Sequence, residues 1–211
     1  REPVGVVGAI VPWNFPFEVT INKIAQILAT GNTCVLKPAP DTPWNATRLG
    51  RLVAEKIDMP AGVFNVVTSS DHLVGEELTL SPKVDLISFT GSTAVGKRIM
   101  EKGAATMKRV FLELGGKSAN IILDDADFNS VVPMGTFACL HGGQGCALPT
   151  RMLLPEMRPS RRGDVIDELH QVFELHLRRA DQREVPDRAV RAVDHEEVRK
   201  TRRCDRSVRT H

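Results

Sequence analysis

Val84-Asp85-Leu86-Ile87-Ser88-Phe89-Thr90-Gly91-Ser92-Thr93 is the stretch that decides the fold. Residues 84–89 form an apolar run with the length of a buried strand, and the small residues after it are typical of a turn. A helix is predicted to begin at this turn and to continue to about Met107. The free backbone N–H groups and the positive dipole end of such a helix suit a phosphate group. The motif therefore predicts a strand–turn–helix unit with a candidate phosphate site at Gly91 and Ser92, the alternative being a glycine turn used only for packing.

The same turn imitates a P-loop, because Gly91 is followed by Gly96 and Lys97 at the P-loop spacing. Position 98 is an arginine, however, where a P-loop needs a serine or threonine to hold magnesium. We therefore reject a P-loop.

Alternation of strands and helices extends outward from this unit in both directions. Predicted strands cover 4–11, 33–36, 63–67, 110–114 and 119–123, and predicted helices cover 17–30, 45–57, 73–80 and 128–140. Apolar strands separated by helices indicate an α/β fold with a parallel sheet covered on both faces. Ligands of such sheets bind beyond the carboxyl ends of the strands, where most of the polar motifs lie.

Composition excludes several classes of function. The formal net charge is only +2, which argues against nucleic acid or an anionic membrane as a partner. No run of residues approaches the length of a membrane span, and the first residues lack a signal-peptide layout. The four cysteines form no Cys-x-x-Cys pair and have no partner histidines at zinc spacing, so we expect no metal, free thiols and a cytoplasmic location.

The composition changes near Pro155. Residues 1–155 hold nearly all of the glycines and lysines, whereas residues 156–211 are rich in arginine, aspartate and glutamate. One amphipathic helix is predicted over 164–177, with weak helix or disorder beyond Arg178. An interaction module that binds acidic partners or nucleic acid through this Arg-rich tail is one possible function of the chain. The 12 acidic side chains of the tail nearly cancel its 14 basic ones, which disfavours that function.

Two polar residues follow predicted strands. Asn14 lies in the stiff segment Pro12-Trp13-Asn14-Phe15-Pro16, where a fixed amide can donate a hydrogen bond to an oxyanion, although an Asn that satisfies a local turn is the more ordinary reading. Lys37 closes a buried strand and can contact a ribose or a phosphate, the alternative being a lysine whose ammonium reaches solvent at the sheet edge.

Cys146 and Glu113 form a candidate catalytic pair. Cys146 lies in Gly142-Gly143-Gln144-Gly145-Cys146-Ala147, where the glycines leave little bulk around the sulfur, and Glu113 lies in Leu112-Glu113-Leu114-Gly115-Gly116-Lys117. A thiol nucleophile and a carboxylate base are the equipment for covalent chemistry at a carbonyl. Cys34 and Cys139 are predicted to be small buried hydrophobic residues, and Cys204 to be incidental.

Five motifs together carry a resemblance. They are Pro12-Trp13-Asn14-Phe15-Pro16, Lys37-Pro38-Ala39, Phe89-Thr90-Gly91-Ser92-Thr93, Leu112-Glu113-Leu114-Gly115-Gly116-Lys117 and Gly143-Gln144-Gly145-Cys146. In order and spacing they resemble the aldehyde dehydrogenase superfamily over about residues 3–155. The resemblance implies a Rossmann-like parallel sheet flanked by helices, followed here by a helical or disordered tail.

The resemblance also implies a mechanism. The residue matching Cys146 attacks a small-molecule aldehyde as a thiolate, and the amide matching Asn14 stabilises the oxyanion. Loss of hydride to the nicotinamide leaves a thioester, and the carboxylate matching Glu113 activates the water that hydrolyses it to the acid.

Cofactor contacts follow from the same resemblance, with NAD or NADP as the expected cofactor. Lys37 matches a lysine that contacts the adenosine ribose. Gly91 and Ser92 match the turn at the pyrophosphate, Val95 lies on the adenine side, and Trp13 and Leu114 line the nicotinamide path. The choice between NAD and NADP stays open, because Pro40 stands where many NAD-preferring members carry a glutamate, and 68–71 replaces a segment that often holds glycines.

Further family elements are not found in this sequence. They include the substrate-lining segments, the motif that holds the nicotinamide ribose and the assembly elements through which full-length relatives oligomerise. We therefore expect little or no turnover from this chain alone, and a non-catalytic nucleotide-binding remnant is the alternative function. A reading-frame change or a truncated gene is our hypothesis for the tail 156–211.

Overall fold

The computed structural model describes residues 2–131, 133–155 and 167. The chain divides into two compact units, Arg1–Gly115 and Gly116–His211. Each unit is described by itself below.

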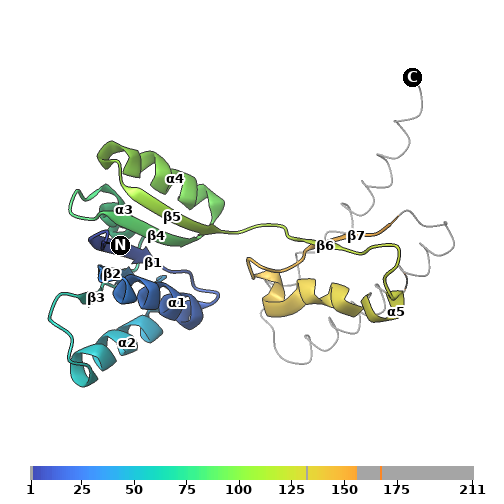
Figure 1. Cartoon of the computed structure of the whole chain (residues 1–211), viewed down its shortest axis with the longest axis horizontal. Coiled ribbons are helices and arrows are strands. Elements are labelled where there is room, and N and C mark those ends of the chain that lie inside the picture. The colour runs from blue at the N-terminus through green and yellow to red at the C-terminus, as the bar shows by residue number, and fades with distance from the viewer. Residues whose placement is uncertain (1, 132, 156–166, 168–211) are drawn as a thin grey trace. The chain divides into compact units, whose positions relative to one another are not determined.

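The first unit is built on a five-stranded parallel sheet (Figure 1). Its strands are β1 (Val6–Ile10), β2 (Thr33–Lys37), β3 (Phe64–Val66), β4 (Leu86–Gly91) and β5 (Arg109–Leu114), in the spatial order β3-β2-β1-β4-β5. The chain winds outward from β1 to β3 and then crosses back, so β4 pairs with the other side of β1. This reversal of strand order is the feature of doubly wound sheets beside which dinucleotides bind.

Two helices cover each face of this sheet. The helices α1 (Pro16–Ala29) and α2 (Pro43–Lys56) pack together on one face, and α3 (Leu73–Leu80) and α4 (Thr93–Gly103) pack together on the other (Figure 1). Prolines occupy the first turns of α1 and α2, where a missing N–H costs no intrahelical hydrogen bond. A parallel sheet needs such cover on both faces, because its strands are apolar on both sides.

Alternate strand residues divide the apolar core between the two faces. Val7, Ala9 and Leu36 are buried beneath α1 and α2, whereas Ile87 and Phe89 are buried with Ile99 of α4. Strand alternation consequently turns Ser88 and Glu113 toward the α1 face and Lys37 toward the α3 face. These orientations decide which polar side chains meet at the candidate site.

Side chains fix the start of β1 at the amino edge of the sheet. The Asn32 Oδ1 atom accepts hydrogen bonds from the N–H groups of Val4 (2.6 Å) and Gly5 (2.9 Å). The N–H of Val6 donates to Asp85 Oδ2 at 2.8 Å. Gly5 has a φ of 123°, a conformation that a residue with a Cβ rarely adopts, and a Cβ there would collide with the Asp85 carboxylate.

The second unit contains a smaller sheet. In it, β6 (Ala119–Ile121) pairs in parallel with β7 (Arg151–Leu153). Between them lie the short helix α5 (Phe128–Val131) and a 3-10 segment, Pro133–Gly143, which is kinked at Leu140, His141 and Gly142. The buried residues Ile122 and Phe128 form a small apolar core.

The α/β fold and the six strands predicted from sequence are confirmed. The single helix predicted over 128–140 is wrong, because the α-helix ends at Val131 and a 3-10 segment begins at Pro133, whose ring lacks an N–H for the α-helical hydrogen bond. The helix from the Gly91 turn ends at Gly103 and continues only as a 3-10 turn to Thr106, and β7 was not predicted. Apart from Asp167, the predicted helix 164–177 lies outside the described residues, as do residues 178–211.

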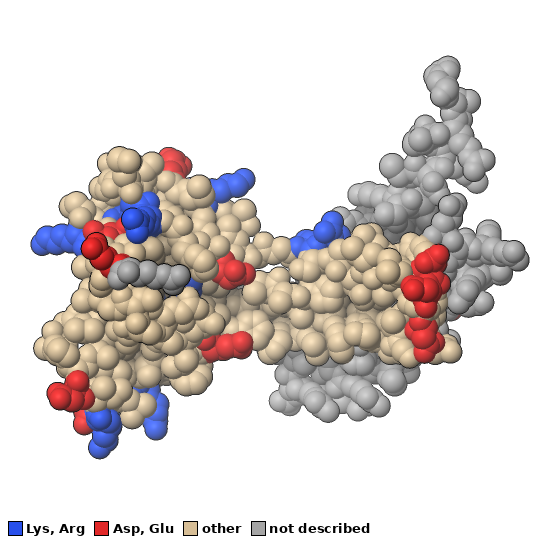
Figure 2. Space-filling model, in the orientation of Figure 1, with Lys and Arg blue, Asp and Glu red and all other residues tan. Residues whose placement is uncertain are grey.

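The described surface is mixed in charge. On the face that Figure 2 shows, acidic and basic side chains are interspersed over the first unit, and most of the surface is uncharged. No helix among the described residues has the length and apolar character needed to cross a membrane.

Candidate functional site

Four predicted site motifs meet at the carboxyl edge of the first unit's sheet. Lys37 ends β2, Asn14 follows β1, Gly91 and Ser92 end β4, and Glu113 lies near the end of β5. These are neighbouring strands in the order β2-β1-β4-β5, with Glu113 in register with Thr90. The sheet topology therefore places the candidate cofactor motifs side by side along one edge.

The start of α4 is the phosphate-suited part of this edge. The Ser92 hydroxyl caps the helix by accepting a hydrogen bond from the Val95 N–H at 3.3 Å, and the Ser92 carbonyl accepts from the Gly96 N–H at 3.0 Å. The amides of Thr93 and Ala94 have no intrahelical acceptor by helix geometry, and they lie at the positive end of an 11-residue helix. Val95 is 45% exposed, so an apolar surface adjoins these donors.

Gly91 is required here by packing. A Cβ at this position would collide with the ring of Phe89, two residues earlier on the same strand. The glycine that the sequence marks as a candidate phosphate contact therefore also serves the alternative reading, in which the turn needs a small residue for packing.

Lys37 supplies a cation at the same edge of the sheet, at the end of β2, which is separated from β4 by β1. Only 5% of the residue is exposed, and its side chain makes no hydrogen bond with any described residue. Burial lowers the pKa of the ammonium, and the Asp71 carboxylate partly opposes that lowering. A largely buried ammonium at the end of β2 and free helix amides after β4 are groups that suit the ribose and phosphates of a dinucleotide.

Lys23 on α1 is a site residue that the sequence analysis missed. Its ammonium donates a hydrogen bond to the Ser88 hydroxyl at 2.9 Å and lies 5.4 Å from the centre of the Phe111 ring. Burial lowers its pKa to about 8, and the charge of Glu113 acts in the opposite direction. Its burial could have been predicted from the sequence, because Lys23 lies at helical spacing from the buried residues Thr20, Ile24 and Ile27.

Glu113 itself lies exposed on the face of β5 that α1 overlooks. The charge of this carboxylate acts on the buried Lys23 ammonium of α1. Leu114, the next residue, is half-buried and turned toward α4, in register with Gly91. The arrangement can perform general-base chemistry at the carboxyl edge of the sheet.

Asn14 and Trp13 lie in the bend between β1 and α1. Asn14 is half-buried, and Trp13 is 46% exposed. Both residues therefore stand at the carboxyl edge, beside the first turn of α1 that Pro16 opens.

Cys146 lies in the second unit, in a turn between the 3-10 segment and β7. The Leu148 N–H donates to the Gly145 carbonyl at 3.4 Å and closes the turn around Cys146. A Cβ on Gly145 would come within 2.9 Å of the Leu148 side chain, so this close turn requires glycine. Cys146 is half-buried and carries a free thiol, as do the buried Cys34 and the half-buried Cys139. Cys34 is as buried as predicted, whereas Cys139 is less so.

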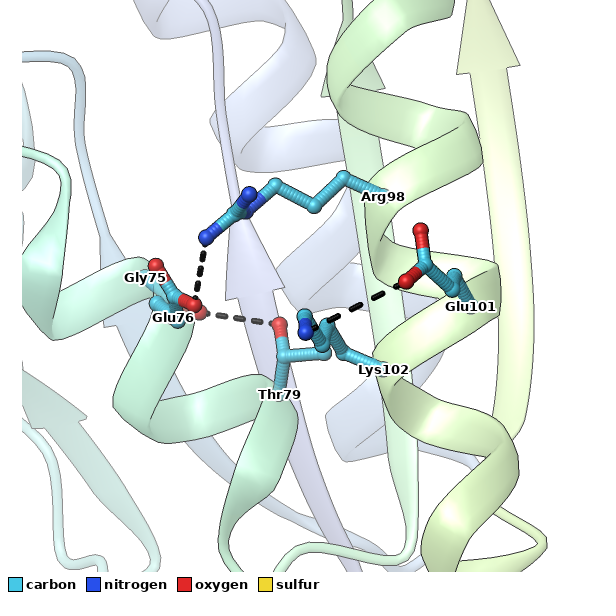
Figure 3. A network of polar contacts seen from close by, with 6 residues as sticks. All are labelled: Gly75, Glu76, Thr79, Arg98, Glu101 and Lys102. Carbon is cyan, nitrogen blue, oxygen red and sulfur yellow. Dashed lines mark hydrogen bonds and ion pairs between the residues drawn. The ribbon is translucent and has the colours of Figure 1, made fainter.

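An ion pair joins α3 and α4, and further polar contacts lie within each of the two helices. Arg98 of α4 forms an ion pair with Glu76 of α3 at 2.7 Å, and Lys102 and Glu101 lie 4.0 Å apart (Figure 3). The Thr79 hydroxyl donates to the Gly75 carbonyl at 2.9 Å. Arg98 thus has a partner at the position where a P-loop would hold magnesium, which agrees with the rejection of that motif. Over the ranges 2–131 and 133–155, no cluster of three or more His, Cys, Asp or Glu side chains could hold a metal ion.

The sequence pattern of the aldehyde dehydrogenase family matches residues 1–181. The chain belongs to this family. The match extends past residue 155, where the motif-based resemblance ends. The assignment of 1–155 and 156–211 as separate regions stays a prediction.

Curated aldehyde dehydrogenases share high identity with this family member. A 3-succinoylsemialdehyde-pyridine dehydrogenase from a Pseudomonas species is 50% identical over 156 residues, which are 74% of this chain and 32% of that protein. The NADP(+) succinate-semialdehyde dehydrogenase GabD of Escherichia coli is 46% identical over 179 residues, 84% of this chain and 36% of that protein. The chain thus spans about a third of the length of these relatives.

Solved structures of the family agree with the fold. A mutant of AldC from Pseudomonas syringae, in complex with NAD+ and octanal, has a TM-score of 0.76 and 42% identity, covering 82% of this chain and 35% of that one. An aldehyde dehydrogenase from Mycobacterium tuberculosis, in complex with NAD+, has a TM-score of 0.75 and 44% identity, with 82% and 35% coverage.

Proposed function

We propose that these residues contribute to the NAD(P)-dependent oxidation of an aldehyde to a carboxylic acid, through a thioester on Cys146. The observation that carries the proposal is the carboxyl edge of the sheet, where neighbouring strands bring together the helix start at Ser92, the buried Lys37 and the Glu113 carboxylate. Family membership supports the assignment of Cys146 as the nucleophile.

In the first step, the Cys146 thiolate attacks the aldehyde carbon, and the carbonyl oxygen becomes an oxyanion. The Asn14 amide and the Cys146 backbone N–H donate hydrogen bonds to that oxyanion. The turn closed by Gly145 and Leu148 leaves the thiol partly exposed for this attack.

A bound NAD or NADP would supply the hydride acceptor for the second step, in which the aldehyde carbon is oxidised. Trp13 and Leu114 border the space for the nicotinamide. Val95 offers an apolar surface for the adenine, and Gly91, Ser92 and Lys37 hold the phosphates and the ribose.

In the third step, Glu113 accepts a proton from a water molecule that attacks the thioester carbon. The C–S bond breaks, the Cys146 thiolate leaves, and the product is the carboxylic acid.

Because the chain spans about a third of its relatives' length, we propose this activity in the setting of a complete family subunit. For the 211-residue chain alone we expect slow turnover or none. Subunit assembly and a cytoplasmic location belong to the same proposal, and the free thiols at 34, 139 and 146 support the latter.

A non-catalytic nucleotide-binding role is the second candidate. The observation that favours it is that the helix start and Lys37 lie within the first unit, whereas Cys146 lies in the other. This role predicts binding of NAD or NADP without thioester formation.

The experiment that separates the two roles measures NAD(P)H formation with a panel of aldehydes, together with labelling of Cys146 by an aldehyde-dependent thiol probe. Cys146→Ser should abolish the labelling and any NAD(P)H formation, and Cys139→Ser, which removes a free thiol seven residues earlier, is the matched control. Because little turnover is expected from this chain in either role, the labelling decides: nucleotide binding without labelling of Cys146 in the native chain would support the non-catalytic role. Turnover that survives in Cys146→Ser would contradict the proposed nucleophile.

A further inference from the structure

Lys37 shares its corner of the sheet with the segment that follows β3. The strands β2 and β3 are parallel neighbours, and the Val67 N–H donates to the Leu36 carbonyl at 2.9 Å. The Lys37 side chain runs along the first turn of α3, because a Cβ on Gly75 would come within 3.8 Å of Lys37 Cδ. The residue that prepares this helix start is Asp71.

The Asp71 carboxylate is held in place by hydrogen bonds to one of its two oxygens. Oδ1 accepts from the Leu73 N–H at 2.8 Å and from the Ser69 hydroxyl at 3.1 Å. Oδ2 accepts no hydrogen bond from any described residue. Asp71 is exposed, so its second oxygen is available to a ligand.

Lys37 and Asp71 both lie at the first turn of α3. The Asp71 charge acts on the Lys37 ammonium, yet no hydrogen bond or ion pair joins them in the described part of the chain. An ammonium offers only donors and a carboxylate only acceptors. A vicinal diol can bridge such a pair, because each hydroxyl both donates and accepts.

A phosphate on one of the diol oxygens changes this complementarity. It brings a charge of about −1.5 to −2 and only weakly available donors. It would gain an attraction to Lys37 and suffer repulsion from Asp71, whose carboxylate is held at the start of α3 by the Leu73 N–H and the Ser69 hydroxyl. In doubly wound folds, an acidic side chain beside the adenosine ribose selects the free 2′-hydroxyl. Pro40, in the loop after Lys37, offers no carboxylate for this purpose.

We propose that Asp71 is a specificity-determining residue, which accepts a hydrogen bond from the free 2′-hydroxyl of the adenosine ribose and selects NAD over NADP. The inference rests on the proposed function, since it requires the adenosine ribose to bind at Lys37.

The test measures dissociation constants of NAD and NADP for the full chain by isothermal titration calorimetry. The native chain should bind NAD more tightly than NADP by about tenfold, the factor that corresponds to ~1.4 kcal/mol of difference in binding free energy. Asp71→Asn keeps an oxygen acceptor for the Leu73 N–H and removes only the charge, so the ratio should shift about tenfold toward NADP. Asp71→Ser, which also retains an acceptor, repeats the test if the asparagine variant fails to fold.

Asp41→Asn is the matched control, because it removes another exposed carboxylate from the loop after Lys37. The ratio of its dissociation constants for NAD and NADP should equal that of the native chain. Tighter NADP binding by the native chain, or a ratio unchanged in both Asp71 variants while NAD still binds, would overturn the inference alone. A shift in Asp41→Asn without one in Asp71→Asn would overturn it in favour of Asp41. Failure of the native chain to bind either nucleotide would overturn the proposed cofactor site and this inference with it.

Discussion

Replacing Lys23 with methionine should change how the stability of the chain depends on pH. Lys23 is only 6% exposed, and burial lowers its pKa from 10.5 to about 8. Such a lowering corresponds to about 3 kcal/mol, since one pKa unit is 1.36 kcal/mol. This is the cost that the folded chain bears for burying the charged form of Lys23.

The sign follows from proton linkage. Below a pH of about 8, Lys23 is protonated in both states, and the folded state bears the full cost. Between about 8 and 10.5, the folded state releases the proton while the unfolded state keeps it. The free energy of unfolding should therefore rise with pH across this window, by up to about 3 kcal/mol.

Lys23→Met removes the titrating group and so this rise. Near neutral pH the variant also loses the hydrogen bond to Ser88, which costs about 1 to 2 kcal/mol. The net expectation is a gain of about 1 to 2 kcal/mol in the free energy of unfolding at neutral pH, and no gain at the alkaline end.

Urea unfolding followed by tryptophan fluorescence provides the assay, because Trp13 and Trp44 both lie in the first unit. Native chain, Lys23→Met and the exposed-lysine control Lys83→Met are compared over a pH range of about 7 to 10. The result is read from the difference in the free energy of unfolding between the native chain and each variant, since other groups titrate in both. If that difference does not change with pH, or if it changes equally in Lys83→Met, the desolvation argument for Lys23 is refuted.

Other substitutions test the edges of the sheet and the buried thiol. Gly5→Ala should lower the free energy of unfolding by about 1 to 3 kcal/mol in the same urea assay, because it strains a positive φ and collides with Asp85; unchanged stability would contradict this. Ser92→Ala removes the cap of α4 and should cost about 1 kcal/mol while weakening nucleotide binding in calorimetry, whereas a pure packing turn would lose stability alone. Burial raises the pKa of Cys34 to about 12, so a thiol reagent should leave it unmodified in the native chain at mildly alkaline pH and label it in urea; rapid native labelling seen by mass spectrometry would count against its burial.

The sequence predicted the strands of the first unit well, because buried parallel strands are nearly continuous apolar runs. Strand β7 has three residues and begins with an arginine, so neither length nor pattern distinguishes it from a loop. The helix predicted over 128–140 failed at Pro133, where apolar spacing persists although the backbone cannot continue an α-helix.

Some residues of the candidate site could be predicted from the sequence, and others could not. Motifs at strand ends were readable, since a parallel sheet brings all its carboxyl ends to one edge. Lys23 interacts electrostatically with Glu113, and Asp71 with Lys37, although the two residues of each pair are distant in the sequence. A local sequence pattern cannot predict such interactions. The sequence does show one unusual feature, which is that Lys23 lies on the apolar face of a predicted helix.

The central position of β1 in the sheet has a consequence for folding during synthesis on the ribosome. β1 leaves the exit tunnel before its partners, yet it pairs with β4, and its Val6 bonds to Asp85, 79 residues later in the sequence. Until β4 has been synthesised, β1 has an unpaired edge that can associate with other nascent chains. Pairing over such sequence separations also slows folding. A strand placed in the middle of the finished sheet is thus open to association with other chains until the last of its partners has been made.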